Sequence, residues 1–365
     1  MKLLEEGRRV GDTYEVERYL GEGAFAEVYR VRHDIFGRQA MKVFKRTGTA
    51  EETKTMLGEA IMLSRIGHPN IIRVFHAATV STPHGMSGYF TMEYVAGGNL
   101  QRFWASHRER FVPVEDSARI LHQVSEGLTV AHWAQPAIIH RDITPQNILI
   151  GYDTDGLRAK LSDFGLAKSV NPMTMLASTK GTLAFKAPES LLNQQGDSRA
   201  SDVWALGTIA YLLLTDTLPY EEGGPTSYFG TDRRTPPRPP HEFNAEVDEE
   251  LERIVLRALD PDPVTRTPDA GALAAELGRW RAQRRRQRAK QAVNLPQTSK
   301  RVLGNASSAD EKEAARLVEQ ARALAKQAVT LPEAADLMEE AFNKSPKLRA
   351  AHEHRLRLWR KGVVT

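Results

Sequence analysis

The sequence predicts an α+β protein with a small β-rich lobe followed by a larger helical lobe. Residues 14–95 hold five short segments in which aromatic and β-branched residues alternate with polar ones, as strands require. One segment with helical spacing, residues 50–67, interrupts them. After Gly98 the apolar residues recur at helical spacing, so the rest of the chain is expected to be mainly helical.

Composition sets limits on the class of protein. The 365 residues are 41% hydrophobic and 26% charged, which is ordinary for a globular protein with a large core. No cysteine is present, which excludes disulfides and thiolate zinc sites and suits a reducing compartment. The charged N-terminus has no signal-peptide core, and the apolar run Trp204–Leu214 is too short to cross a bilayer. We therefore expect a cytoplasmic protein with no transmembrane segment.

The expected elements follow from periodicity. In the first lobe, strands are predicted at residues 14–21, 26–34, 39–45, 71–80 and 88–95, with the helix at 50–67 between the third and fourth. In the second lobe, helices are predicted at residues 118–133, 201–215, 248–260 and 268–283. The predicted parts are an N-terminal extension (1–13), a two-lobed domain (14–280, with lobes 14–95 and 96–280), a basic stretch with a linker (281–309) and a helical module (310–365).

The charge balance supports a boundary near Trp280. Residues 281–365 carry 19 Lys and Arg against 9 Asp and Glu, whereas residues 1–280 carry 31 against 37. Six of the ten residues from Arg281 to Lys290 are basic. We interpret this stretch as a solvated continuation of the preceding helix. Binding of nucleic acid or an anionic surface is the less favoured alternative, because no aromatic residues interleave with the charges.

The last 56 residues predict an interaction module. Residues 313–328 and 333–346 have helical spacing, and Ala334, Ala341 and Pro346 stand at positions that resemble the second helix of a tetratricopeptide unit. A generic helical hairpin is an equal alternative. One such unit cannot bury much surface alone, so we expect it to dock on the rest of the chain, on a sister chain or on a partner protein.

A glycine-rich turn, "GEGAFAEV" at Gly21–Val28, lies between two predicted strands. Glycines allow backbone N–H groups to approach phosphates closely, although such turns are common in hairpins. Further motifs follow in order: "AMKVF", "HRDITPQN", "LSDFG", "FKAPE", "SDVWALG" and "DPDPVTRT". They bring in these charged or polar residues: Lys42, Asp142, Asn147, Asp163, Glu189, Asp202 and Arg266. Glu59, on the helix predicted at 50–67, could pair with Lys42.

Together these motifs resemble the eukaryotic-like serine/threonine protein kinases, in particular the bacterial members, over residues 14–280. The resemblance implies a two-lobed protein kinase fold and an ATP-dependent signalling enzyme. Such an enzyme transfers the γ-phosphoryl group to Ser or Thr hydroxyls of protein substrates and often phosphorylates its own activation loop. The implied cofactors are ATP and Mg²⁺, with Mn²⁺ as an alternative metal.

The resemblance also assigns catalytic roles. Lys42 would bind the phosphates of ATP, held in direction by an ion pair with Glu59. Asn147 and Asp163 would bind the metal, since hard oxygen ligands suit Mg²⁺. Asp142 would orient or accept the proton of the incoming hydroxyl.

ATP would contact a second set of residues. Met92 would be the gatekeeper, Glu93 and Val95 would offer hinge hydrogen bonds, and Asn99 would contact the ribose. The remaining members are the glycines of the phosphate loop and the apolar residues around adenine: Gly21, Gly23, Leu20, Val28, Ala40 and Leu149.

Other positions would support or switch the site. Asp202 would hold the catalytic-loop backbone, and Glu189 would pair with Arg266. Arg141 would bind a phosphate on the activation loop, residues 163–189. The candidate phosphosites are Thr174, Ser178 and Thr179. Thr182 favours Ser/Thr over Tyr specificity, and His140 and Phe164 would join a buried stack with Leu63 and Val74.

Two departures from the kinase pattern stand out. Ala26 replaces the third glycine of the loop, a mild change. Thr144 replaces a lysine that in most members contacts the γ-phosphate, and it offers one hydroxyl and no charge. We favour an active kinase, because Lys42, Asp142 and Asp163 are all present. The alternatives are a nucleotide-binding pseudokinase scaffold that recruits partners through its C-terminal helices, and a kinase acting on small molecules.

Overall fold

The computed structural model describes residues 2–47, 57–58, 64, 66–107, 111–153, 155–164, 183–192, 197–220, 236–293, 308–327, 330–360 and 363. The chain divides into two compact units. The first comprises Met1–Tyr94 and Ser162–Lys180, and the second comprises Val95–Leu161 and Gly181–Thr365. The predicted helix at 50–67 lies almost entirely outside the described residues.

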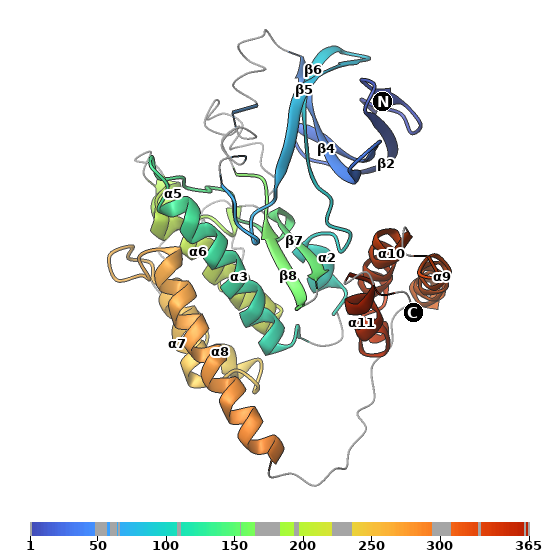
Figure 1. Cartoon of the computed structure of the whole chain (residues 1–365). Helices are drawn as coiled ribbons and strands as arrows, with labels where there is room; N and C mark the ends of the chain where they lie inside the picture. The colour runs from blue at the N-terminus through green and yellow to red at the C-terminus, as the bar shows by residue number, and fades with distance from the viewer. Residues whose placement is uncertain are drawn as a thin grey trace. The chain divides into compact units, whose positions relative to one another are not determined.

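The first unit is built on one antiparallel sheet with the strand order β1-β2-β3-β4-β6-β5 (Figure 1). Its strands are β1 (Arg9–Val10), β2 (Tyr14–Glu22), β3 (Ala26–His33), β4 (Gly37–Thr47), β5 (Val74–Thr82) and β6 (Gly85–Glu93). The prediction of five strands missed β1, because a two-residue edge strand has no alternation to detect.

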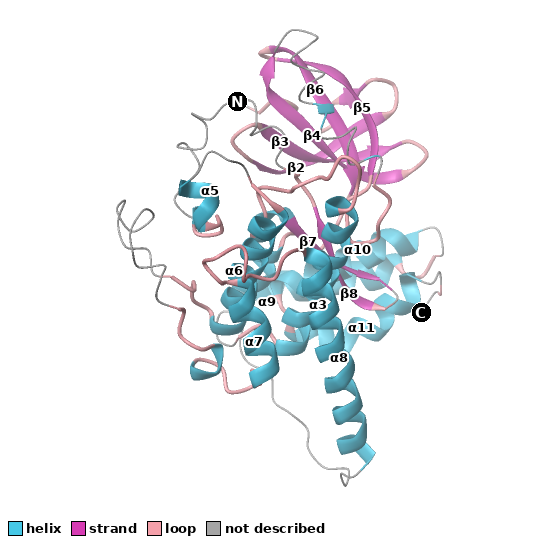
Figure 2. Ribbon diagram, turned by 90° about the vertical axis from the view of Figure 1, so that its left-hand side faces the viewer, coloured by secondary structure: helices cyan, strands magenta, loops and turns pink. Residues whose placement is uncertain are grey.

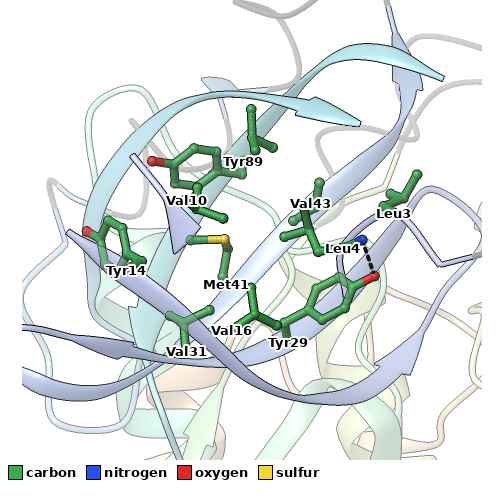
Figure 3. Close-up of a cluster of buried hydrophobic side chains, with 11 residues drawn as sticks. Leu3, Leu4, Val10, Tyr14, Val16, Tyr29, Val31, Met41, Val43 and Tyr89 are labelled. Carbon is green, nitrogen blue, oxygen red and sulfur yellow. Dashed lines mark hydrogen bonds between the residues drawn. The ribbon is translucent and has the colours of Figure 1, made fainter. Parts of the chain in front are cut away.

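The N-terminal extension completes the core of this unit (Figure 3). Leu3, Leu4 and Val10 are buried against side chains of β2, β3, β4 and β6. The backbone N–H of Leu3 donates to Glu27 (2.9 Å) and that of Leu4 to the hydroxyl of Tyr29 (3.0 Å). The segment before β1 is therefore fixed on the sheet both by apolar burial and by buried hydrogen bonds.

The second unit is mainly helical (Figure 2). Helix α6 (Arg199–Thr215) lies at its centre, buried on all sides, and contacts α3 (Val114–His132), α7 (Glu249–Ala258) and α8 (Ala270–Val293). The other elements are α2 (Leu100–Ala105), α5 (Pro188–Leu192), the hairpin β7 (Ile148–Asp153) and β8 (Gly156–Leu161), and the 3₁₀ turns η1 (Pro145–Asn147) and η5 (Pro240–Glu242). The predicted α+β class, with a β-rich and a helical part, is confirmed.

Helix α8 runs without a break from Ala270 through the basic stretch to Val293. Arg284 Nη1 lies 2.7 Å from Asp248 Oδ2, and Arg288 Nη1 lies 4.0 Å from Glu115 Oε2. The basic residues thus continue the last predicted helix of the domain and meet acidic groups of the same unit. No helix in the described part of the chain has an apolar stretch long enough to cross a membrane.

Three C-terminal helices follow: α9 (Ser308–Leu324), α10 (Leu331–Lys344) and α11 (Lys347–Arg360). Alanines fill the contacts of α10 with its neighbours, and Ala314, Ala321 and Ala334 are fully buried. Residues 310–365 were predicted to be helical with interruptions at Pro332 and Pro346, and α11 is the helix that follows Pro346. Its buried hydrophobic residues, Leu356 and Trp359, are few among charged ones.

The C-terminal helices pack on the rest of the second unit through α11 and β7. The guanidinium of Arg349 lies 5.3, 4.6 and 5.8 Å from the ring centroids of Phe103, Tyr152 and Phe342, as cation–π contacts require. The amide nitrogen of Asn343 donates to the carbonyl of Gly97. Of the docking partners considered from the sequence, the structure shows the chain's own helical unit.

A buried ion pair joins two of the C-terminal helices, α10 and α11. Glu339 on α10 is 1% exposed, and its Oε1 lies 2.6 Å from Arg360 Nη2. The same guanidinium nitrogen reaches Asp336 at 3.0 Å. Burial outweighs the attraction of Arg360 and raises the pKa of Glu339 to about 7, from an ordinary value of 4.5.

The stability of the protein should therefore depend on the ionisation of Glu339. The unfolded carboxyl titrates near its ordinary pKa and the folded one near 7, so the folded state binds the extra proton between these values. Its contribution to stability is full at low pH and is lost as the pH rises toward 7. We expect wild type to lose stability relative to Glu339→Gln between pH 5 and pH 7.5, measured by denaturant unfolding. Glu340→Gln, a partly exposed neighbour, is the control, and parallel pH curves for wild type and Glu339→Gln would contradict the assignment.

Candidate active site

The loop from His140 to Asn147 joins α3 to β7 in the second unit, and one buried carboxylate holds its first part. Asp202 is 2% exposed and accepts the backbone N–H groups of His140 (2.8 Å) and Arg141 (2.9 Å) on its two oxygens. Arg141 has φ +69°, in the left-handed region that residues other than glycine rarely adopt. Such a conformation persists only where its surroundings hold it, and here Asp202 does so.

Asp202 is in turn fixed by its own surroundings. Its helix α6 begins with a capping box in which Ser198 and Ser201 bond each other's backbone N–H. His132 Nε2 lies 3.0 Å from Asp202 Oδ2, and the N–H of Ala270 points at His132 Nδ1 (3.4 Å). Because Nδ1 is the acceptor, the ring proton is on Nε2 and is donated to Asp202.

Asp142 follows directly in the loop and is bound at several atoms. Its N–H donates to His140 Nδ1 (3.3 Å), which gives the buried His140 a structural contact. The Asn147 amide nitrogen donates to the Asp142 carbonyl (2.7 Å) and to Oδ2 of its carboxylate (3.1 Å). The amide nitrogen of Asn147 is thereby turned toward Asp142, and its amide oxygen lies on the opposite side.

A cavity lies beside Asp142. Among its lining residues are Arg141, Asp142, Thr144, Phe185 and Lys186. Thr144 is 5% exposed and carries no charge, whereas Lys186, from the segment before Pro188, brings an ammonium group. A positive charge therefore reaches this cavity from a segment about forty residues after the loop.

Glu189 and Arg266 form a bidentate ion pair next to the first residues of α6. Arg266 Nη1 and Nη2 lie 2.6 and 3.0 Å from the two Glu189 oxygens. The Arg266 side chain is fully buried, donates to the carbonyl of Ala200 (2.9 Å) and stacks 4.9 Å from the Trp204 ring centroid. Its polar groups are thus satisfied from several directions, which a buried charge requires.

In the first unit, Lys42 lies on β4 and its Nζ is 2.8 Å from Asp163 Oδ1. Asp163, like Arg141, has a positive φ of +58°. Lys42 on β4 stands opposite Val28 on β3, the last residue of the glycine-rich segment Gly21–Val28. The predicted partner Glu59 lies outside the described residues.

The glycine-rich turn closes the β2–β3 hairpin. Gly21 stands opposite Val28, and the N–H of Gly23 donates to the carbonyl of Ala26 (2.8 Å). Leu20 and Val28 are partly buried.

Ala40 and Met92 face each other on β4 and β6, and both are buried. Glu93 ends β6, and its N–H is bonded to the carbonyl of Arg73 (2.9 Å). The first unit thus places two of the predicted adenine contacts on adjacent strands and a predicted hinge residue at the end of one of them.

The other predicted ATP contacts belong to the second unit: Val95, Asn99 and Leu149. Asn99 caps α2 by accepting the N–H of Arg102 (3.1 Å) and forms a backbone bridge with Leu149. A Cβ on Gly97 would lie 2.0 Å from the carbonyl oxygen of Ile150, so only glycine fits at that position.

Several predicted residues lie outside the described part of the chain. They are Glu59, Leu63, Thr174, Ser178, Thr179 and Thr182. Phe164 is described and buried, and Val74 begins β5. Two polar residues of the loop network, His132 and Lys186, were not predicted as site residues. Lys186 stands in the motif "FKAPE", but nothing in that motif marks a contact with the loop, and His132 stands in no motif.

Comparisons with known proteins agree on one family. The sequence profile described as "Protein kinase domain" matches residues 14–358. The chain is 32% identical over 281 residues to a probable serine/threonine-protein kinase, PknB, of Corynebacterium glutamicum, covering 74% of this chain and 42% of that protein. It is 31% identical over 281 residues to a probable serine/threonine-protein kinase of Streptomyces coelicolor, covering 75% and 41%. It is 30% identical over 277 residues to the serine/threonine-protein kinase PknB of Mycolicibacterium smegmatis, covering 74% and 43%. The chain thus spans less than half the length of these relatives.

The Glu189–Arg266 pair should be a main source of stability in the second unit. Arg266→Ala leaves the carboxylate of Glu189 without its partner and removes the stacking on Trp204, so we expect a loss of about 3–5 kcal/mol. Arg253→Ala, which breaks an exposed pair with Glu250, should cost less than about 1 kcal/mol. Denaturant unfolding measures both, and equal small losses would contradict the importance of the buried pair.

Proposed function

The chain belongs to the protein kinase family, and on that basis we propose that it is an ATP-dependent serine/threonine kinase. It would transfer the γ-phosphoryl group of Mg·ATP to Ser or Thr hydroxyls of proteins. The observation that carries the proposal is the catalytic loop, in which His140 and Asn147 bind Asp142 directly and Asp202 holds the two residues before it. Phosphoryl transfer depends on positioning and charge more than on covalent chemistry, and this loop provides positioning.

Asp142 acts on the acceptor hydroxyl in this proposal. Its carboxylate orients the Ser or Thr hydroxyl toward the γ-phosphorus and receives the hydroxyl proton as the new P–O bond forms. The amide nitrogen of Asn147, 3.1 Å from Asp142 Oδ2, holds the direction of that carboxylate. The bond to the β-phosphate oxygen breaks, and ADP leaves with the negative charge.

Lys42 and Asp163 serve the nucleotide. The ammonium of Lys42 pairs with Asp163 and would bind the phosphates of ATP, next to the glycine-rich turn. The family implies a divalent metal, and the oxygen donors of Asp163 and Asn147 suit Mg²⁺, with Mn²⁺ as an alternative. When bound, the metal neutralises the developing charge on the phosphates.

We propose that adenine and ribose are bound by the residues that the kinase resemblance assigned to ATP contact. Met92 would be the gatekeeper beside Ala40, and backbone groups of Glu93 and Val95 would bind the base. Asn99 would reach the ribose with its amide nitrogen, because its amide oxygen is committed to the cap of α2. Gly21 and Gly23, with Leu20, Val28 and Leu149, complete the set.

The pseudokinase scaffold is the second candidate, and Thr144 is the observation that favours it. A scaffold would bind nucleotide and recruit partners without phosphoryl transfer. The presence of Asp142 together with Lys42 and Asp163 supports transfer instead, because the carboxylate of Asp142 acts on the acceptor hydroxyl and is not needed for nucleotide binding alone. The loop hydroxyls Thr174, Ser178 and Thr179 remain the proposed sites of autophosphorylation, with Arg141 as the phosphate-binding residue.

Replacement of Asp142 separates the two candidates. Asp142→Asn keeps the size of the side chain but removes the proton acceptor, so kcat should fall at least about 100-fold. The Kd for Mg·ATP should stay within about threefold, because Asp142 is proposed to contact the acceptor hydroxyl and not the nucleotide. The measurement is transfer of label from γ-labelled ATP to a generic protein substrate, beside calorimetric binding of Mg·ATP.

Asp155→Asn is the control, because this carboxylate is 77% exposed in the β7–β8 turn. It should leave both quantities unchanged. A wild type that binds Mg·ATP and transfers no label would contradict the proposed activity and support the scaffold.

A further inference from the structure

Lys186 binds the peptide that leads into Asp142. The residue stands directly before Ala187 and Pro188, and its Nζ donates a hydrogen bond to the carbonyl oxygen of Arg141. Nζ also lies 3.9 Å from Asp197 Oδ2, and the two side chains are only 14% and 11% exposed. An ammonium that is so largely removed from water needs such hydrogen-bonding and ionic partners.

The contact between Lys186 and the Arg141 carbonyl affects the position of Asp142. Arg141 adopts its left-handed conformation with the N–H bound to Asp202 and the carbonyl bound to Lys186. A peptide unit is planar, so the carbonyl direction of Arg141 also sets the direction of the Asp142 N–H and the position of its Cα. Asp202 thus holds the N–H of this strained residue, and Lys186, near the C-terminal end of the activation loop, holds its carbonyl.

The cavity supports the same assignment. Lys186, Asp142 and Thr144 line one cavity, and Thr144 has no charge to contribute. Lys186 is thus a cationic side chain in the wall of this cavity, which is also lined by Thr144, the loop position where most kinases carry a lysine. Its ammonium is committed to the backbone of the loop, which indicates that it acts on the loop and not directly on a phosphate.

We propose that Lys186 is a positioning residue for phosphoryl transfer, which holds the Arg141–Asp142 peptide and through it the Asp142 carboxylate. This inference rests on the proposed kinase activity. It links the segment before Glu189 to the catalytic loop, so that the two move as one element.

The test uses full-length Lys186→Met, Lys186→Arg and the control Lys326→Met, an exposed lysine after α9. Misplacement of a catalytic group by about 1 Å costs on the order of 100-fold in rate, so Lys186→Met should lower kcat by about 10- to 100-fold. The KM for ATP should change by less than about twofold, since Lys186 acts on the acceptor side. Lys186→Arg keeps a charged donor and should restore most of kcat, and Lys326→Met should equal wild type.

Hydrogen exchange gives a second readout that does not depend on turnover. The peptide covering residues 140–148 should exchange faster in Lys186→Met than in wild type or Lys326→Met. If Lys186→Met melts early, Lys186→Gln, a neutral donor, replaces it, and its kcat should fall below those of wild type and Lys186→Arg.

Three results overturn the inference, and a fourth overturns the proposed kinase activity on which it rests. An active wild type with unchanged kcat in Lys186→Met removes the positioning role alone, as does a loss carried entirely by KM for ATP. Unchanged exchange at residues 140–148 in that variant contradicts it as well. A wild type that binds Mg·ATP without transferring label removes the kinase activity itself, and the role of Lys186 with it.

Discussion

The buried carboxylate of Asp202 is the interaction on which the catalytic loop depends. A carboxylate removed from water is stable only when donors satisfy it, and Asp202 has the N–H groups of His140 and Arg141 together with His132. These bonds fix two consecutive amides and hold Arg141 in a left-handed conformation that it would otherwise avoid. The position of Asp142 follows, because it is the next residue. The loop is thus shaped by helix α6, which lies some sixty residues later in the chain.

The C-terminal helices belong to the same compact unit as this loop. Arg349 lies among three aromatic rings, two of them from α2 and β7, and Asn343 binds the carbonyl of Gly97. Burial of a guanidinium in this way needs the rings as its partners, so the contact depends on residues from both parts of the unit. Of the docking partners expected for this module, which were its own chain, a sister chain and another protein, the structure shows its own chain, close to the residues that follow β6.

Sequence reasoning succeeded where chemistry restricts residue type and where periodicity is strong. The motifs around Lys42, Asp142 and Asp163 are recognisable because phosphate and metal require these groups at fixed spacings. Helices such as α6 and α7 were predicted from their apolar patterns. The contacts of His132 and Lys186 could not be predicted, because each depends on a partner distant in the chain. The hairpin β7–β8 was also missed, because its two strands are recognised by their pairing with each other and not by a pattern within either one.

The central claim is that Asp202 sets the geometry from which Asp142 acts, and the kcat of Asp202→Asn tests it most directly. An asparagine has one acceptor oxygen, so its NH₂ group would face the N–H of either His140 or Arg141. The account predicts that kcat falls at least about tenfold, as expected for a displaced catalytic group, while the Kd for Mg·ATP stays unchanged. A variant that keeps kcat within about twofold of an active wild type would contradict the claim.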